Sequence, residues 1–247
     1  MFGYNAYLVG LALGTFVTVS PIWWAYVALG GVVSVPATLG TARVFKTWGV
    51  AALTAPFVLT AWLFLLATYA FSAIGGGGLP MATSIVPVDP AAANPLAFGA
   101  FVQGVFRSIA QVFLKASILA ALLLLAGLAV NSIAAAAFAL AGAVVAVVTA
   151  HLLGAESDLI TGGLLGFSPV LTAVALGTVF HAPGWRVAAY AALGTIFTVI
   201  AQAAFNVALT PLAIPALTGP FVLVTWLFLL PRQSFDRAAP TQTEGTR

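Results

Sequence analysis

The sequence predicts an all-α polytopic membrane protein, and three observations support this fold class. Of the 247 residues, 62% are hydrophobic and only 5% are charged, whereas a soluble domain has about 25% charged residues. Eight basic and five acidic residues are too few to cover a water-facing surface, which excludes a soluble globular enzyme. The uncharged stretches are long, and about 20 apolar residues suffice to cross a bilayer.

The composition also excludes two classes of site. The chain has no cysteine, so disulfides and cysteine-based metal sites are absent, and we expect no metal or cofactor. The formal charge of +3 is spread over few residues, which is too sparse for a nucleic-acid partner. The lipid bilayer is therefore the expected environment of the chain.

Gly, Pro and charged residues divide the chain into segments. About eight transmembrane helices are expected, at residues 3–19, 22–36, 48–70, 117–132, 134–152, 160–181, 186–209 and 217–231. The Gly- and Pro-rich residues 71–97, with four consecutive glycines at 75–78, are expected to form a flexible linker. The polar residues 232–247 are expected to form a disordered tail.

The segment 98–114 differs from the spans. Its polar residues recur every four positions, which places them in one stripe on a helix. They are Gln103, Arg107 and Gln111, and Lys115 continues the row. Two interpretations are open: a helix lying flat at the membrane interface, or a tilted re-entrant helix whose stripe faces a cavity.

The distribution of charge predicts the orientation of the chain. Successive spans cross the membrane in opposite directions. This places the expected loop 37–47, the loop 182–186 and the C-terminal tail on one side of the membrane. Six basic residues lie there: Arg43, Lys46, Arg186, Arg232, Arg237 and Arg247. The acidic residues Asp89, Glu156 and Asp158 lie on the other side. Because basic residues mark cytoplasmic loops, the C-terminus is predicted to be cytoplasmic.

An internal repeat is the strongest signal in the sequence. The 14 residues that begin at Leu53 and the 14 that begin at Leu217 are identical at 11 positions. A second matching pair starts at Gly3 and Gly166. Five spans separate the copies, and an odd number reverses their direction across the membrane. Such an inverted repeat places a solute path at the midplane between the halves, which favours a channel or transporter over a membrane enzyme.

Thr54 and Thr218 are the most conspicuous polar residues of the repeat. Each stands two positions before a proline, at the start of a Leu- and Phe-rich helix. A 13-residue helix is only about 20 Å long, so both helices are expected to begin inside the membrane. Two interpretations are open: each threonine only caps its own helix, or the two hydroxyls meet on the solute path.

The expected path favours a neutral solute. None of the five acidic residues falls inside an expected span, and intramembrane carboxylates mark proton or cation coupling. Passage is therefore expected to be passive, and threonine hydroxyls and a glutamine amide suit a small solute with N–H donors. Tyr4 and Phe167, at matching positions of the repeat, either wall a slot for a flat molecule or serve as packing and interfacial anchors.

Three motifs resemble the bacterial urea transporter family: the repeated L-T-[AG]-P-F-V-L-x-x-W-L-F-L-L, the repeated G-[YF]-[NS]-x-x-L-x-x-x-A-L-G, and R-S-I-A-Q-V-F at 107–113. The resemblance covers nearly the whole chain up to Pro231. It implies an inverted-repeat urea-transporter fold, with five spans and one re-entrant helix in each half. It also implies a homotrimer in the cell (inner) membrane, with one pore in each protomer that passes urea down its gradient.

The resemblance also assigns the substrate-binding residues. Thr54 and Thr218 correspond to a central pair of threonines, and Gln111 to the glutamine of the second re-entrant helix, with Val112 beside it. The slot positions are Tyr4, Leu8, Phe167 and Leu171. The sequence departs from the family pattern at 115–117, Ser168 and 120–121.

The same resemblance divides the chain into four parts. Residues 1–70 are a remnant of the first inverted repeat with three spans, 71–97 a linker, 98–231 the second repeat with a re-entrant helix and five spans, and 232–247 a cytoplasmic tail. The first-half partner of Gln111 would precede Met1, so we expect the chain to be N-terminally truncated. Two alternatives stay open: a channel for another small neutral solute (a short amide, ammonia or water), or a non-transporting remnant.

Overall fold

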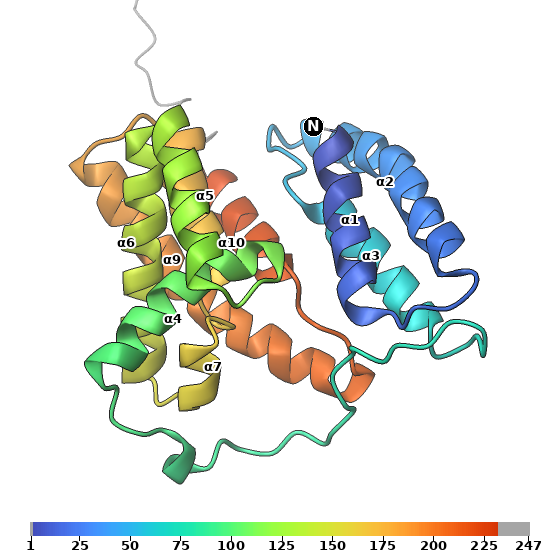
Figure 1. Ribbon diagram of the computed structural model, residues 1–247. Helices are drawn as coiled ribbons and strands as arrows, with labels where there is room; N and C mark the ends of the chain where they lie inside the picture. The colour runs from blue at the N-terminus through green and yellow to red at the C-terminus, as the bar shows by residue number, and fades with distance from the viewer. Residues whose placement is uncertain (1, 232–247) are drawn as a thin grey trace, which may run out of the picture.

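The computed structural model describes residues 2–231, which form helices joined by turns and loops, without a strand in that range. The first group of helices contains α1 (Phe2–Phe16), α2 (Trp23–Lys46) and α3 (Ala55–Ala67). These three helices pack against one another and form the right-hand group in Figure 1.

The second group contains the remaining helices and forms the left-hand part of Figure 1. Its helices are α4 (Phe98–Ala110), α5 (Ile118–Asn131), α6 (Ile133–Leu152), α7 (Ser157–Thr161), α8 (Phe167–Val174), α9 (Trp185–Leu209) and α10 (Gly219–Leu229). The π-helical turn η3 (Ala175–Val179) prolongs α8, and the 3-10 turns are η1 (Pro90–Ala92), η2 (Gln111–Phe113) and η4 (Thr210–Leu212). Helix α8 packs against both α6 and α9, and α10 contacts α3 of the first group.

Helix length and apolarity confirm the polytopic membrane class. Three helical segments are long and apolar enough to cross a bilayer: α2, α6, and α9 continued by η4. The pair α4–η2 and α5 satisfies the same criterion together, with a bend of 72° between them. Large apolar side chains also face outwards, as at Val32 and Leu39 of α2 and Leu123 of α5, which suits a lipid environment. The expected number of eight spans stays a prediction.

Several expected boundaries were wrong. The segment 37–47 was expected as a loop, but all of it except Thr47 belongs to α2, which continues through Pro36 to Lys46. Proline is tolerated inside membrane helices, so Pro36 was a poor stop signal. The span expected at 48–70 is helical only from Ala55 to Ala67, since the chain first turns through left-handed residues at Gly49 and Leu53.

The span expected at 160–181 is also interrupted. Helix α7 ends at Thr161, and α8 begins only at Phe167. Gly163 lies between them with φ +74°, a conformation that ends a helix. The stretch 160–181 therefore contains the end of α7, a turn, and α8 continued by η3.

The glycine segment 75–78 was predicted to be a flexible linker, but it makes specific contacts with the end of α1. Thr18 N–H donates to the carbonyl of Gly75 over 2.7 Å, and Gly77 N–H donates to Thr18 Oγ1 over 3.0 Å. A Cβ added to Gly78 would overlap the backbone of Thr15. The segment needs glycine because the two backbones approach so closely.

Equivalent positions of the sequence repeat make the same contact within each group. Tyr26 Oη donates to the carbonyl of Phe64 over 2.6 Å, and Tyr190 Oη donates to the carbonyl of Phe228 over 2.6 Å. Both residues of the second pair lie 164 positions after those of the first. The tyrosine and phenylalanine rings also pack similarly, with centroids 4.8 Å and 5.0 Å apart. The repeat in sequence is therefore a repeat in structure.

Candidate functional site

Two loops, one before α3 and one before α10, form the centre of the candidate site. Leu53 in the first loop has φ 53°, and Leu217 in the second has φ 49°. This left-handed conformation costs a non-glycine residue about 1–2 kcal/mol. Its presence at equivalent positions of both copies means that the surrounding structure holds each loop in the same unusual turn.

The residue after each of these leucines is the threonine predicted to be central. Thr54 and Thr218 are 6% and 5% exposed, and their Oγ1 atoms lie 2.7 Å apart, within hydrogen-bond distance. Both stand at the N-cap of a helix, yet neither side chain bonds to its own helix. The capping interpretation is therefore wrong for the hydroxyls, which bond to each other.

This pair retains hydrogen-bonding capacity for a solute. Two hydroxyls offer two protons and four lone pairs, and one bond between them uses one of each. Either oxygen can be the donor. One proton and three lone pairs remain, which suits a molecule that has both N–H donors and a carbonyl acceptor.

Two more hydrogen bonds join the copies reciprocally. Trp62 of α3 donates from Nε1 to the carbonyl of Pro215 over 2.9 Å, and Trp226 of α10 donates to the carbonyl of Ala51 over 2.9 Å. Donors and acceptors are both separated by 164 residues. Such mutual contacts are typical of a two-fold relation between two copies.

A small cavity lies beside the threonine pair. It is lined by Leu8, Leu11, Phe57, Gln111, Val112, Leu114, Phe167, Leu217 and Thr218. Its accessible volume of about 10 Å³ is that of one water-sized sphere. Seven of the nine lining residues are apolar, and Gln111 and Thr218 are the two polar ones.

The turn between α7 and α8 positions Gln111. Gln111 Nε2 donates to the carbonyl of Gly162 over 3.2 Å, which leaves Oε1 as a free acceptor among the hydrogen bonds of the described residues. The neighbouring Gly163 approaches so closely that an added Cβ would overlap the backbone of Arg107 and Ser108. This contact fixes the end of α4 against the turn, and with it the direction of the glutamine side chain.

The remaining residues of the polar stripe on α4 lie elsewhere. Gln103 and Lys115 are exposed, and Arg107 donates from Nη1 to the carbonyl of Thr161 over 3.2 Å. The opposite face of α4 is buried against protein through Gly104, Val105 and Ser108. Of the stripe, only Gln111 reaches the cavity.

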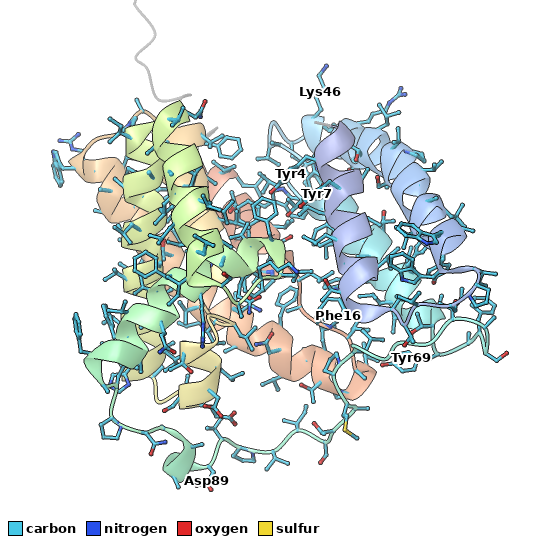
Figure 2. The ribbon with its side chains drawn as sticks, viewed as in Figure 1. Tyr4, Tyr7, Phe16, Lys46, Tyr69 and Asp89 are labelled. Atoms are coloured by element: carbon cyan, nitrogen blue, oxygen red, sulfur yellow. The ribbon has the colours of Figure 1, made fainter. Side chains whose placement is uncertain are left out.

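The structure brings most of the predicted site residues together. Five line the cavity, namely Leu8, Gln111, Val112, Phe167 and Thr218, and Thr54 is bonded to Thr218. Tyr4 and Leu171 are not among the lining residues. Tyr4 is 43% exposed on α1, whereas Leu171 packs in a cluster with Phe221 and Val222. Figure 2 shows Tyr4 and Tyr7 on the side of α1 that faces the second group of helices.

Four lining residues were missed by sequence reasoning. Phe57 and Leu217 belong to the repeated motif itself, so the repeat could have identified them as site residues. Leu11 lies three positions after Leu8, on the same helix face. Leu114 directly follows Q-V-F and has φ 54°, a backbone conformation that no residue pattern indicated.

Metal chemistry has no donor set in the part of the chain that the structure describes. Within residues 2–231, no group of three or more His, Asp or Glu side chains gathers to hold an ion. The ring nitrogen of His181 lies 3.1 Å from the carbonyl of Leu176, away from the cavity.

Comparison with known proteins identifies the family. The family model described as "Urea transporter" matches residues 1–233. This chain belongs to the urea transporter family. It is 26% identical to Urea transporter 1 of Rattus norvegicus and 24% identical to Urea transporter 1 of Ovis aries, each over 231 residues and 92% of this chain. The chain spans 60% of the length of these relatives.

Proposed function

We propose that this protein passes urea across the membrane passively, down its concentration gradient. The observation that carries the proposal is the hydrogen-bonded pair of Thr54 and Thr218, which joins the two copies of the repeat beside the cavity. Membership of the urea transporter family supports it. The name of the relatives, Urea transporter 1, agrees with urea as the solute.

The chemistry of the cavity fits urea. Urea is flat and uncharged, with four N–H donors and one carbonyl acceptor. The free lone pairs of the threonine pair and Gln111 Oε1 accept N–H groups, and the remaining hydroxyl proton can donate to the carbonyl. Phe57 and Phe167 supply aromatic walls, which offer a flat molecule contact without competing hydrogen bonds.

The uncharged lining of the cavity supports passive passage. The side chains that line the cavity in residues 2–231 contain no ionisable group. A charged solute would therefore lose hydration without an opposite charge to replace it. A neutral solute loses less, and its passage needs no coupled proton or cation.

The proposal includes the arrangement of the chain in the membrane. Residues 1–70 and 98–231 belong to two halves of opposite direction, with α4 as a re-entrant helix, 71–97 as the linker and 232–247 as a cytoplasmic tail. The reciprocal bonds of Trp62 and Trp226 support a two-fold relation between the halves. The proposed location is the cell (inner) membrane and the proposed assembly a homotrimer, both implied by the family resemblance. The tail lies outside the described residues.

A comparison of solutes tests the choice of urea. Proteoliposomes containing the chain are exposed in turn to gradients of urea, acetamide, ammonia and glycerol, and solute entry is followed by light scattering or by internal pH. We expect the largest increase over protein-free liposomes for urea, and a smaller one for acetamide, which has half the N–H donors. A larger increase for ammonia, or for all solutes equally, would contradict urea as the preferred solute.

A further inference from the structure

The hydrogen bonds of Trp62 and Trp226 link each tryptophan to the loop that carries one threonine of the pair. Each indole belongs to one copy of the repeat, and each acceptor carbonyl belongs to the other. The acceptors, Ala51 and Pro215, lie three residues before Thr54 and Thr218. Each tryptophan therefore holds the loop that presents the threonine of the opposite copy.

We propose that Trp62 and Trp226 are positioning residues that set the contact between the Thr54 and Thr218 hydroxyls. Trp62 acts on Thr218 through the carbonyl of Pro215, and Trp226 acts on Thr54 through the carbonyl of Ala51. Neither indole lines the cavity. Only the effect on solute passage rests on the proposed function, since the positioning itself is a property of the fold.

The loops need such an anchor because their conformation is unfavourable. Leu53 and Leu217 adopt left-handed φ values between the anchored carbonyl and the threonine. Apart from these anchors, each loop has a short-range bond, from Ala55 N–H to the carbonyl of Ala52 and from Gly219 N–H to that of Ala216, both over 3.1 Å. A left-handed leucine persists only where its surroundings hold it.

Neither threonine side chain bonds to the backbone of its own loop or helix. Neither hydroxyl caps its helix, so the position of each side chain is set by the backbone of its loop. The distance of 2.7 Å between the oxygens therefore depends on two backbone segments from distant parts of the chain. A hydrogen bond from one copy to the loop of the other restricts this distance directly.

Packing fixes the direction of each indole N–H. The ring of Trp226 stacks on that of Phe45, with centroids 3.8 Å apart and planes at 24°. A Cβ added to Gly219 would lie 3.3 Å from two ring atoms of Trp62, so that ring packs directly on the start of α10. Both rings are held in place, and the N–H points at one carbonyl.

The loop before Thr218 has a further side-chain anchor. Tyr69 Oη donates to the carbonyl of Ala213 over 2.9 Å, which adds a second anchor to the loop before Thr218. For this reason both tryptophans are needed in the test, and Trp226→Phe is expected to have the larger effect.

Disulfide formation between positions 54 and 218 tests the proposal without any transport measurement. The chain has no native cysteine, so a Thr54→Cys/Thr218→Cys variant has a single possible intramolecular disulfide. Because the replaced oxygens lie 2.7 Å apart, sulfur atoms at these places are close to the bonding distance of about 2.05 Å. The rate of oxidation reports how well the two loops are aligned.

The rate is compared in four versions of the full chain carrying this cysteine pair: with both tryptophans intact, with Trp62→Phe, with Trp226→Phe, and with Trp23→Phe. Trp23 is the matched control, because its Nε1 is buried without a hydrogen-bond partner. We expect oxidation to be about fivefold slower or more with Trp62→Phe and Trp226→Phe, as for the loss of one hydrogen bond. Trp23→Phe should leave the rate unchanged.

Equal rates in all four versions would overturn the proposal, as would an equal slowing by Trp23→Phe. If phenylalanine at position 62 or 226 prevents folding, 3-benzothienylalanine at the same position keeps the bicyclic shape and removes only the N–H, with the same expectations. A protein that carries no urea but shows the predicted oxidation rates would contradict the proposed function and leave the positioning role standing. Urea transport together with four equal oxidation rates would support the proposed function and overturn the positioning role.

Discussion

The hydroxyl oxygens of Thr54 and Thr218 lie 2.7 Å apart, although 164 residues separate them in the chain. This contact joins the starts of α3 and α10, the two helices that carry the repeated 14-residue motif. It leaves hydrogen-bonding capacity beside a narrow apolar cavity.

Replacing Gln111 should reduce urea flux more than replacing another glutamine of the same helix. Gln111→Leu removes both the bond to the carbonyl of Gly162 and the free acceptor at the cavity. The loss of one such bond predicts a fall of about threefold to tenfold in flux through proteoliposomes.

Gln103→Leu is the control, because Gln103 is exposed on the same helix and does not line the cavity. Its flux should match that of the unmodified chain. Equal losses in both variants would mean that α4 as a whole, rather than the Gln111 amide, determines the effect.

Urea flux should be independent of ion gradients. The cavity lining within residues 2–231 contains no ionisable side chain that could couple a proton or sodium ion to the solute. Uptake driven by a urea gradient is measured with and without a protonophore, and with sodium replaced by choline. We expect the same rate in all conditions, whereas a collapse of uptake with the protonophore would indicate a coupled transporter.

Cysteine labelling should place Arg43 in the cytoplasm and Asp89 outside. Both side chains are exposed, and Figure 2 shows Lys46, near Arg43, at the opposite end of the molecule from Asp89. Arg43→Cys should react with a membrane-impermeant maleimide only after the cells are opened, and Asp89→Cys should react in intact cells, as the bias of basic residues predicts. External labelling at position 43 would reverse the proposed orientation.

Substitution of Gly163 should destabilise the second group of helices. Gly163 has φ +74°, and an added Cβ would overlap the backbone of α4. Gly154 has a similar φ of +73°, with open space around it. We expect Gly154→Ala to cost about 1 kcal/mol for the left-handed conformation alone.

Gly163→Ala adds the cost of overpacking and should lower the free energy of unfolding by about 2–4 kcal/mol. Denaturation in detergent, followed by circular dichroism, compares the two variants. A similar loss in both would show that the close approach of α4 to the turn does not matter for stability.

The repeat explains why much of the site could be predicted from sequence. Thr54 and Thr218 stand at the same place in two nearly identical motifs, and the proposed two-fold relation between the halves would bring such positions together near its axis. The polar stripe pointed to Gln111 and the second repeated motif to Phe167, whereas Leu8 and Val112 came from the family resemblance alone; all four line the cavity.

Other features depend on backbone geometry that residue patterns do not show. Proline at position 36 usually marks the end of a helix, but α2 continues to Lys46. The left-handed turns at Leu53 and Leu217 occur at residues that rarely adopt this conformation. The contacts of 75–78 with α1 depend on a close approach between segments far apart in sequence. Tertiary contacts determine the course of α2, the left-handed turns and the packing of 75–78, and such contacts are not encoded in a local residue pattern.

The most direct test measures urea flux through the threonine pair itself. Thr54→Val and Thr218→Val each keep the shape of the side chain and remove one hydroxyl of the 2.7 Å contact. An unpaired group in a dry site costs about 1–3 kcal/mol, so stopped-flow urea flux in proteoliposomes should fall by roughly fivefold to a hundredfold in each variant. Flux in the unmodified chain that clearly exceeds that of protein-free liposomes, with this fall in both variants, is the result we predict. Unchanged flux in both valine variants would contradict the account.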